Sequence, residues 1–198
     1  FNAIDSVPLT AIAFFMLTGE LMTSATITDR LVALSRALIG RIRGGLAQVN
    51  VLVSMFFAGM NGSVVADTAT VGALVLPAMK KAGYPAAFSA AVTGVSSTIG
   101  GIIPPSIMMI VLANSTEISI AALFAAGIIP GVLIGVVIMI INHYFAIKYN
   151  FERSDEPFSI RRAGKELYRS SFALLIPLVL VGSVMGGVAS VVEAGAIT

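Results

Sequence analysis

The chain has 198 residues, of which 57% are hydrophobic and 11% are charged, and its mean hydropathy is +0.97. Because soluble domains carry about 25% charged residues, this composition excludes an ordinary soluble protein and predicts an integral membrane protein. The net charge is +2, but the basic residues border apolar segments, so membrane topology explains them better than nucleic-acid binding does. The chain contains no cysteine, which excludes disulfides and thiolate catalysis.

The first two predicted elements are a membrane span and an amphipathic helix. Residues 1–27 contain an apolar run of about 20 residues, the length that a tilted span requires. Residues 28–43 form a helix that carries Leu31, Leu34 and Leu38 on one face and arginines on the other. This pattern is typical of a helix that lies in the plane of the membrane interface.

Residues 44–79 are apolar except for a polar run in the middle, GMNGSVVADTAT at 59–70. The segment is too long for one span and barely long enough for two short ones. A re-entrant helical hairpin that turns at Asn61, Gly62 and Ser63 fits this length. Asp67 lies just beyond the turn, and a carboxylate at membrane depth costs several kcal/mol unless it is paired, faces a cavity or binds an ion. The polar run is therefore a candidate functional site.

The charges provide a partial test of the hairpin. The basic residues form three clusters, at 30–43, 80–81 and 148–169. With a hairpin at 44–79 and spans at 86–113 and 120–147, all three clusters fall on the cytoplasmic side, as the positive-inside rule requires. Two very short full spans would give the same agreement.

The later elements follow in order. The span at 86–113 is interrupted by SSTIGGIIPPS at 96–106, where Pro104 and Pro105 prevent regular helix, so we expect a discontinuous helix that opens near 98–106. The span at 120–147 contains Pro130, which predicts a kink. Residues 148–170 are expected to form a cytoplasmic loop with a short helix that begins near Asp155, and residues 171–190 form the last span. Both ends of the sequence lie in apolar segments, and we interpret them as cuts in a longer chain.

Five motifs together resemble one family. They are GELM at 19–22, RGGLAQVNV at 43–51, FAGMNGSVVADTATVG at 57–72, LPAMKKAGY at 76–84 and STIGGIIPPSIMMIV at 97–111. The chain resembles the N-terminal half of the large membrane (permease) subunit of TRAP (tripartite ATP-independent periplasmic) transporters. One position departs from the family pattern: where a Thr-Pro-Thr-Glu-Ala motif is usual, this chain has Ser190-Val-Val-Glu193-Ala194.

The resemblance implies an all-α polytopic membrane protein that forms one half of an inverted-repeat, elevator-type transporter. It implies sodium-coupled secondary import of an organic acid, such as a C4-dicarboxylate or sialic acid, across the bacterial or archaeal inner membrane. A periplasmic substrate-binding protein and a small membrane subunit are the implied partners, beside the lipid bilayer. No cofactor is expected apart from sodium as the coupling ion, and no nucleic acid is expected to bind.

The hairpin and the opened helix supply the candidate site residues. A hairpin tip and an opened helix both offer carbonyl and side-chain oxygens to a hard cation. The predicted sodium ligands are Asn61, Gly62, Ser63, Asp67, Thr98, Gly100 and Gly101. Asp67 is either a ligand or a structural residue that caps the second hairpin helix and pairs with a neighbour.

The substrate is expected at the opened helix, where Ser106 and the amides after Pro105 can face a carboxylate. The predicted substrate-binding residues are Ser63, Ser97, Thr98, Pro104, Pro105 and Ser106. In the alternative interpretation, Pro104 and Pro105 only shape the packing. Glu20, His143 and Glu193 lie near span ends and are interpreted as interfacial residues.

Other classes of function remain as alternatives. The sequence contains no HExxH or GxGD motif and no Ser/His dyad, so an intramembrane enzyme is not expected. Another ion-coupled secondary transporter, a channel or a scaffold subunit is the alternative, and a channel would conduct without saturation by solute.

Overall fold

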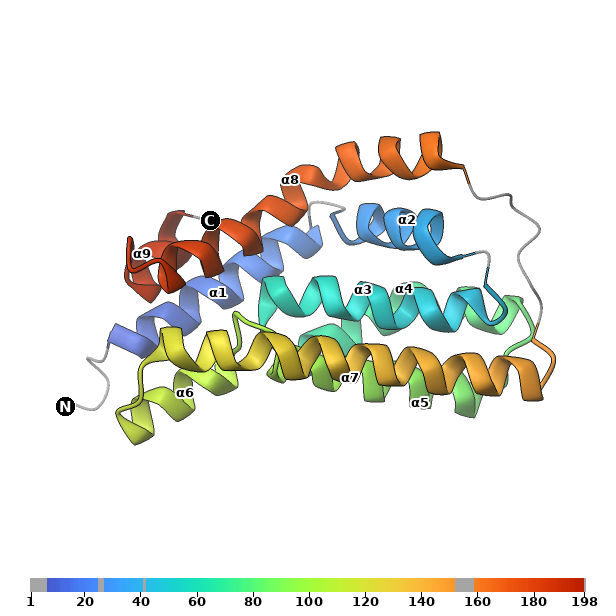
Figure 1. The fold of residues 1–198 in the computed structure, drawn as a ribbon, viewed down its shortest axis with the longest axis horizontal. Helices are drawn as coiled ribbons and strands as arrows, with labels where there is room; N and C mark the ends of the chain where they lie inside the picture. The colour runs from blue at the N-terminus through green and yellow to red at the C-terminus, as the bar shows by residue number, and fades with distance from the viewer. Residues whose placement is uncertain (1–6, 25–26, 41, 152–158, 198) are drawn as a thin grey trace.

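The computed structural model describes residues 7–24, 27–40, 42–151 and 159–197 (Figure 1). These residues form helices and contain no strand, which confirms the all-α prediction. The helices are α1 (Val7–Ser24), α2 (Ile27–Ile39), α3 (Gly45–Asn61), α4 (Val64–Lys81), α5 (Ala86–Ser97), the short 3₁₀ helix η1 (Thr98–Gly101), α6 (Ile107–Thr116), α7 (Ile120–Lys148), α8 (Ile160–Met185) and α9 (Val191–Ile197).

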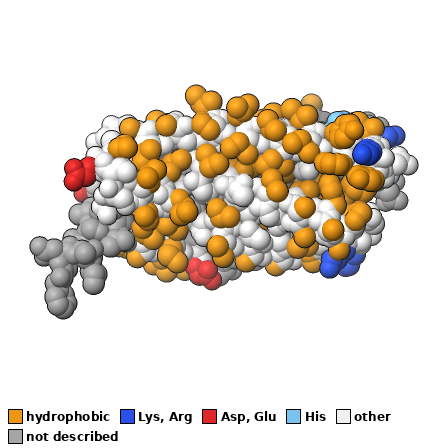
Figure 2. Space-filling model, turned by 90° about the horizontal axis from the view of Figure 1, so that it is seen from below, with side chains coloured by type: hydrophobic (Ala, Val, Ile, Leu, Met, Phe, Trp, Pro, Cys, Tyr) orange, Lys and Arg blue, Asp and Glu red, His pale blue; other side chains and the backbone are white. Residues whose placement is uncertain are grey.

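Two helices, α7 and α8, are long and apolar enough to cross a membrane. Only 28% of the apolar window of α7 and 22% of that of α8 are buried, so neither is the buried central helix of a soluble protein. Hydrophobic side chains cover most of the face that Figure 2 shows, and the Lys and Arg side chains of that face lie at one end. An apolar exposed surface of this extent is what contact with lipid requires, and the chain is a multi-pass membrane protein.

The predicted hairpin is present as two helices, α3 and α4, which run side by side in opposite directions (Figure 1). Gly62 ends α3 with a φ of 58°, a left-handed conformation that glycine adopts without strain. Ser63 then begins α4, because its side chain accepts a hydrogen bond from the Ala66 amide. The re-entrant position of this hairpin in the bilayer stays a prediction.

The helix ends that carry basic residues lie together. Arg36 is in the last turn of α2, Lys80 and Lys81 are in the last turn of α4, and Lys148 ends α7. These three helix ends lie at the same end of the molecule, where α8 also begins (Figure 1). The arrangement agrees with a single cytoplasmic side for the basic clusters.

The predicted discontinuous helix is also present. Regular helix stops at Ser97, η1 and an irregular segment follow, and α6 starts at Ile107 after its N-cap Ser106. The break therefore falls where Pro104 and Pro105 remove backbone donors. α6 extends to Thr116, three residues beyond the predicted end of this span.

Helix α2 differs from its prediction. Its apolar face was expected to lie against lipid at the interface, but Leu31 and Leu34 are fully buried. The helix lies between α3 and α8, roughly along their direction (Figure 1). The amphipathic pattern of α2 therefore marks the face that packs against protein. Periodicity alone does not distinguish a face covered by protein from one covered by lipid.

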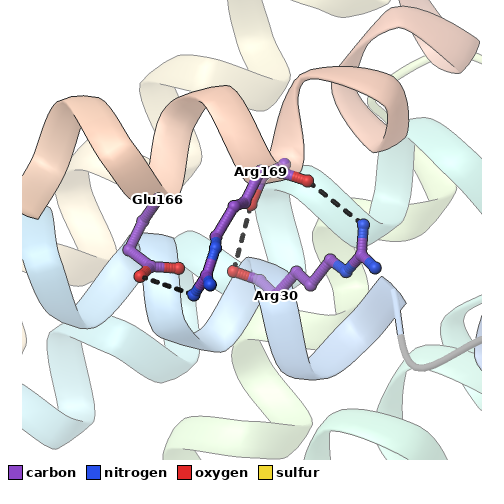
Figure 3. A network of polar contacts seen from close by, with 4 residues as sticks. Arg30, Glu166 and Arg169 are labelled. Atoms are coloured by element: carbon purple, nitrogen blue, oxygen red, sulfur yellow. Dashed lines mark hydrogen bonds and ion pairs between the residues drawn. The ribbon is translucent and has the colours of Figure 1, made fainter.

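Polar contacts attach α2 to α8, as Figure 3 shows. The Arg30 guanidinium donates to the carbonyl oxygen of Arg169 over 3.3 Å, and the Ser170 hydroxyl donates to the carbonyl oxygen of Arg30 over 3.2 Å. Glu166 forms an ion pair with Arg169 at 3.6 Å within α8. These contacts fix the position of α2 along α8.

The C-terminal region also departs from its predicted boundaries. The predicted helix start near Asp155 lies outside the described residues, and α8 runs without interruption from Ile160 to Met185. The short helix and the last span are therefore one helix. Beyond it, the Glu193 carboxylate accepts hydrogen bonds from the Ser190 amide and hydroxyl, both at 2.8 Å, which caps α9. These bonds hold the pKa of the Glu193 carboxyl below its ordinary value.

Two apolar clusters form the core. The larger one surrounds α3 and includes Val49, Val53 and Phe57 together with residues of α2, α4, α5 and α7. The smaller one joins α1, α6, α7, α8 and α9 and includes Phe124 and Leu180. The hairpin therefore lies in the larger cluster, and the break between α5 and α6 leads from one cluster to the other.

Candidate functional site

The tip of the hairpin contacts the opened segment between α5 and α6. The Ile107 amide, at the start of α6, donates to the carbonyl oxygen of Gly62 over 3.2 Å. A Cβ at Gly62 would collide with the carbonyl oxygen of Pro105, and a Cβ at Gly100 would lie 3.6 Å from the carbonyl oxygen of Ser63. The structure thus brings together the two motifs that the sequence separates by about forty residues.

The side chains of the tip are largely engaged in local hydrogen bonds. The Asn61 Oδ1 atom accepts from the Ser63 amide at 2.9 Å, and the Ser63 hydroxyl accepts from the Ala66 amide at 3.4 Å. The Asn61 Nδ2 atom is buried and has no hydrogen-bond partner among the described residues. Helix α1 covers this position closely, since a Cβ on Gly19 would lie 2.7 Å from the Cβ of Asn61.

Ser106 closes the opened segment. Its hydroxyl donates to the carbonyl oxygen of Gly101 over 2.8 Å and accepts from the Met109 amide at 3.3 Å. The side chain is fully buried. This geometry gives Ser106 a structural role as the N-cap of α6, and its predicted contact with a substrate stays a prediction.

Thr98 and Ser97 point in different directions at the end of α5. The exposed Thr98 hydroxyl donates to the Val95 carbonyl of its own helix over 2.7 Å, and no described contact brings this side chain to the hairpin tip. The Ser97 hydroxyl is buried and donates to the Thr93 carbonyl over 2.8 Å. Of these two predicted residues, Ser97 is the one whose side chain faces the hairpin, because it lies beside Asp67.

Asp67 is fully buried one turn into α4. The Ser97 and Ser54 hydroxyls face its carboxyl group, but neither carboxyl oxygen has a partner that meets hydrogen-bond geometry among the described residues. Ser63 is the N-cap of α4, and no described cation pairs with Asp67. Ser63 therefore takes the place of Asp67 as the cap of α4, and the two predicted roles of Asp67, ion ligand and structural partner of its neighbours, stay predictions.

The two hydroxyls beside Asp67 direct their protons elsewhere. Ser97 donates to the Thr93 carbonyl, and Ser54 donates to the Ser96 hydroxyl over 3.2 Å. Both oxygens therefore lie beside a carboxyl group to which no described donor makes a hydrogen bond of regular geometry. The Asp67 carboxyl and the Ser54 and Ser97 hydroxyls thus form a buried group of oxygens. A cation that prefers oxygen ligands can stabilise such a group, and so can a proton on the carboxyl.

Sequence reasoning missed the polar residues behind Asp67. Asn50, Ser54, Thr93 and Ser96 are buried and joined by hydrogen bonds between α3 and α5. The available signal was their spacing: positions 50 and 54, and positions 89, 93 and 96, place polar residues on one face of each otherwise apolar helix.

Two glycines of α7 let this helix pack closely against the opened segment. A Cβ on Gly127 would collide with the Ile102 carbonyl oxygen, and one on Gly131 would meet the Ile103 side chain and lie 3.4 Å from its amide nitrogen. α7 is one continuous helix that contains Pro130, and the predicted kink at that position stays a prediction. These small residues let the irregular backbone approach a continuous helix, where it is shielded from lipid.

We expect Gly127→Ala to lower the free energy of unfolding by about 1 to 3 kcal/mol, because the added methyl group meets backbone that cannot withdraw. Thermal unfolding of the complete natural protein in detergent measures this effect. Gly164→Ala in α8 is the control: nothing lies within 4 Å of its Cβ, so we expect helix propensity to raise stability by up to about 1 kcal/mol. Equal effects of the two substitutions would contradict the predicted contact.

The sequence matches the family described as "Tripartite ATP-independent periplasmic transporter, DctM component" over residues 1–198. The chain belongs to the DctM family of TRAP transporter permeases. The chain is 39% identical over 192 residues to the sialic acid TRAP transporter permease SiaT of Haemophilus influenzae. This alignment covers 96% of the chain and 31% of the relative.

Two further TRAP relatives align over the whole chain. The chain is 35% identical to the sialic acid large permease SiaM of Vibrio cholerae and 36% identical to the C4-dicarboxylate large permease DctM of Pseudomonas aeruginosa, each over 197 residues. Each alignment covers 100% of this chain and 46% of the relative. The TRAP chain thus spans less than half the length of these curated relatives.

Proposed function

We propose that this chain forms the first half of the transport machinery of a sodium-coupled secondary importer. The hairpin tip, the opened segment and Asp67 hold the coupling ion, and an organic acid binds at the start of α6. Sodium is the only small group that the proposal requires. The observation that carries it is the fully buried Asp67, which faces two hydroxyl oxygens and receives no hydrogen bond from the described residues.

The burial of this carboxyl group supports a role in binding the coupling ion. An ionised carboxylate without partners in an apolar interior costs several kcal/mol, whereas sodium bound beside it offsets that cost and links ion binding to the conformation of the hairpin. The opened segment adds a backbone carbonyl beside the tip, that of Pro105 against Gly62. Discontinuous helices that meet at mid-membrane are how secondary transporters combine ion and substrate sites.

The substrate class and the partners are proposed from the family. Sialic acid, C4-dicarboxylate and 2,3-diketo-L-gulonate permeases are among the relatives, and the substrates in these names are organic acids. We propose that a periplasmic binding protein delivers the solute, that a small membrane subunit supports the permease in the bacterial inner membrane, and that transport follows an elevator motion. From the same relatives we propose a transport role without catalysis.

The test is uptake of the solute by proteoliposomes that contain the complete natural permease, its small subunit and its binding protein. We expect uptake that requires an inward sodium gradient and saturates with solute. Uptake that is unchanged when potassium replaces sodium would overturn the coupling. Conductance without saturation by solute would favour the channel alternative.

A further inference from the structure

Behind Asp67, a chain of hydrogen bonds crosses from α3 to α5 and centres on Asn50. Asn50 is fully buried in the middle of α3. Its Nδ2 atom donates to the Thr93 hydroxyl over 2.7 Å and lies 3.7 Å from the Met79 sulfur, and its Oδ1 atom accepts from the Ser96 hydroxyl at 3.3 Å. A buried amide is stabilised only when both of its ends are satisfied in this way.

The hydrogen bonds have a direction that matters for the neighbouring site. Thr93 donates its proton to the Ser89 carbonyl over 3.0 Å, so its oxygen is free to accept from Asn50. Ser96 shares its proton between Asn50 Oδ1 and the Thr93 carbonyl, at 3.3 and 3.0 Å. Because Ser96 directs its proton to these two acceptors, its oxygen accepts the proton of Ser54.

The last hydroxyl of this chain, that of Ser54, faces Asp67. A hydroxyl has a single proton, so Ser54 either gives it to Ser96 and presents lone pairs to Asp67, or gives it to the Asp67 carboxylate. In the first state Ser54 can serve as a cation ligand. In the second state its proton competes with a cation for the same carboxylate oxygen.

We propose that Asn50 is a positioning residue for the ion site: through Ser96 it holds the Ser54 hydroxyl in the orientation that offers oxygen to a cation at Asp67. Asn50 itself lies in the layer behind the site. The proposal rests on the proposed sodium site and adds to it a residue outside the hairpin tip and the opened segment. It also gives α5 a part in setting the strength of ion binding.

Gln48 provides a matched control in the same helix. It is also a buried amide, 2% exposed, and its Nε2 atom donates to the Met139 carbonyl of α7 over 2.8 Å. Replacing either amide by leucine removes a side-chain donor from α3 and places an apolar group in the core; leucine has the shape of asparagine and is one methylene shorter than glutamine. Of these two amides, only Asn50 is connected through described hydrogen bonds, by way of Ser96, to Ser54, which faces Asp67.

The experiment measures the melting temperature of the purified complete permease as sodium replaces potassium at constant ionic strength. For Asn50→Leu we expect the sodium concentration for half-maximal stabilisation to rise by about fivefold, the equivalent of one lost hydrogen bond. For Gln48→Leu we expect a change of less than about twofold, although both variants lose a buried hydrogen bond in potassium.

Ser96→Ala supplies a second test that removes only one oxygen, in case Asn50→Leu does not fold. We expect Ser96→Ala to weaken sodium binding by about threefold or more. The double variant Asn50→Leu/Ser96→Ala should bind sodium no more weakly than the single variant with the lower affinity, because the two residues act on Ser54 through the same hydrogen bonds. Normal sodium binding in Ser96→Ala, or equal shifts in the Asn50 and Gln48 variants, would overturn the role of Asn50. A native protein that sodium does not stabilise would overturn the sodium site itself, and the role of Asn50 with it.

Discussion

Asp67→Asn is expected to abolish stabilisation by sodium while leaving the protein in potassium about as stable as the native form. The amide removes the negative charge that the ion neutralises but keeps the size of the side chain. A ligand present at about 100 times its dissociation constant stabilises a protein by about 2.7 kcal/mol, and this increment should disappear. In potassium we expect a change within about 1 kcal/mol, because without sodium the buried carboxyl group takes up a proton and is then as neutral as the amide. Thermal unfolding in the two salts measures both quantities.

Asp29→Asn is the matched control for this substitution. Asp29 is an exposed aspartate in the first turn of α2, so it shares the helix position of Asp67 without its burial. Its replacement should leave the response to sodium unchanged. If Asp67→Asn instead destabilised the protein equally in both salts and kept the sodium increment, the carboxyl group would be structural and the proposed ion site would be contradicted.

Gly62→Ala is expected to disrupt the contact between the hairpin tip and the opened segment. Gly62 has a φ of 58°, and a Cβ there would collide with the Pro105 carbonyl and lie 3.0 Å from the Ser106 Cα. The left-handed conformation costs about 1 to 2 kcal/mol for alanine, and the collision adds about 1 to 3 kcal/mol. We expect a loss of stability of about 3 kcal/mol and a loss of most sodium-driven uptake in proteoliposomes.

Gly83→Ala separates these two causes. Gly83 has a φ of 79° after the end of α4, and nothing lies within 4 Å of its Cβ. It should therefore lose only the conformational contribution, about 1 to 2 kcal/mol, and retain uptake. Similar losses of stability and uptake in the two variants would show that the contact with Pro105 has no role of its own.

The two substitutions test different parts of one arrangement. Gly62 brings the tip close to the opened segment, and Asp67 lies one turn deeper against Ser54 and Ser97. A sodium increment that survives Gly62→Ala but not Asp67→Asn would locate the ion at the carboxyl group. Loss of the increment in both would indicate that the tip and Asp67 hold the ion together.

Much of this architecture can be predicted from local chemistry. Gly62 ends one helix because glycine adopts positive φ, and Ser63 begins the next because serine caps a helix N-terminus. The hairpin turn could therefore be predicted from these two residues. Pro104 and Pro105 interrupt a helix wherever they occur in one. Composition alone predicted a membrane protein, and the motifs predicted the family to which the chain belongs.

Other features depend on what surrounds a residue, and local patterns do not contain that information. The amphipathic face of α2 is equally suited to lipid and to protein, and only packing shows that α3 and α8 cover it. Likewise, Ser106 and Thr98 have hydroxyls that either bind a ligand or satisfy their own backbone. In the structure both hydroxyls donate to backbone carbonyls, and their contact with a ligand stays a prediction.

The sequence by itself determined that a carboxyl group lies just beyond a hairpin turn within an apolar segment, since Asp67 follows Ser63 by four residues. Only the tertiary structure decided what faces that group. The direction of a hydroxyl proton depends on acceptors contributed by another helix, and Asn50, Thr93 and Ser96 meet only when α3 packs against α5. Hydrogen bonding across forty residues is a property of packing, which residue order alone does not specify.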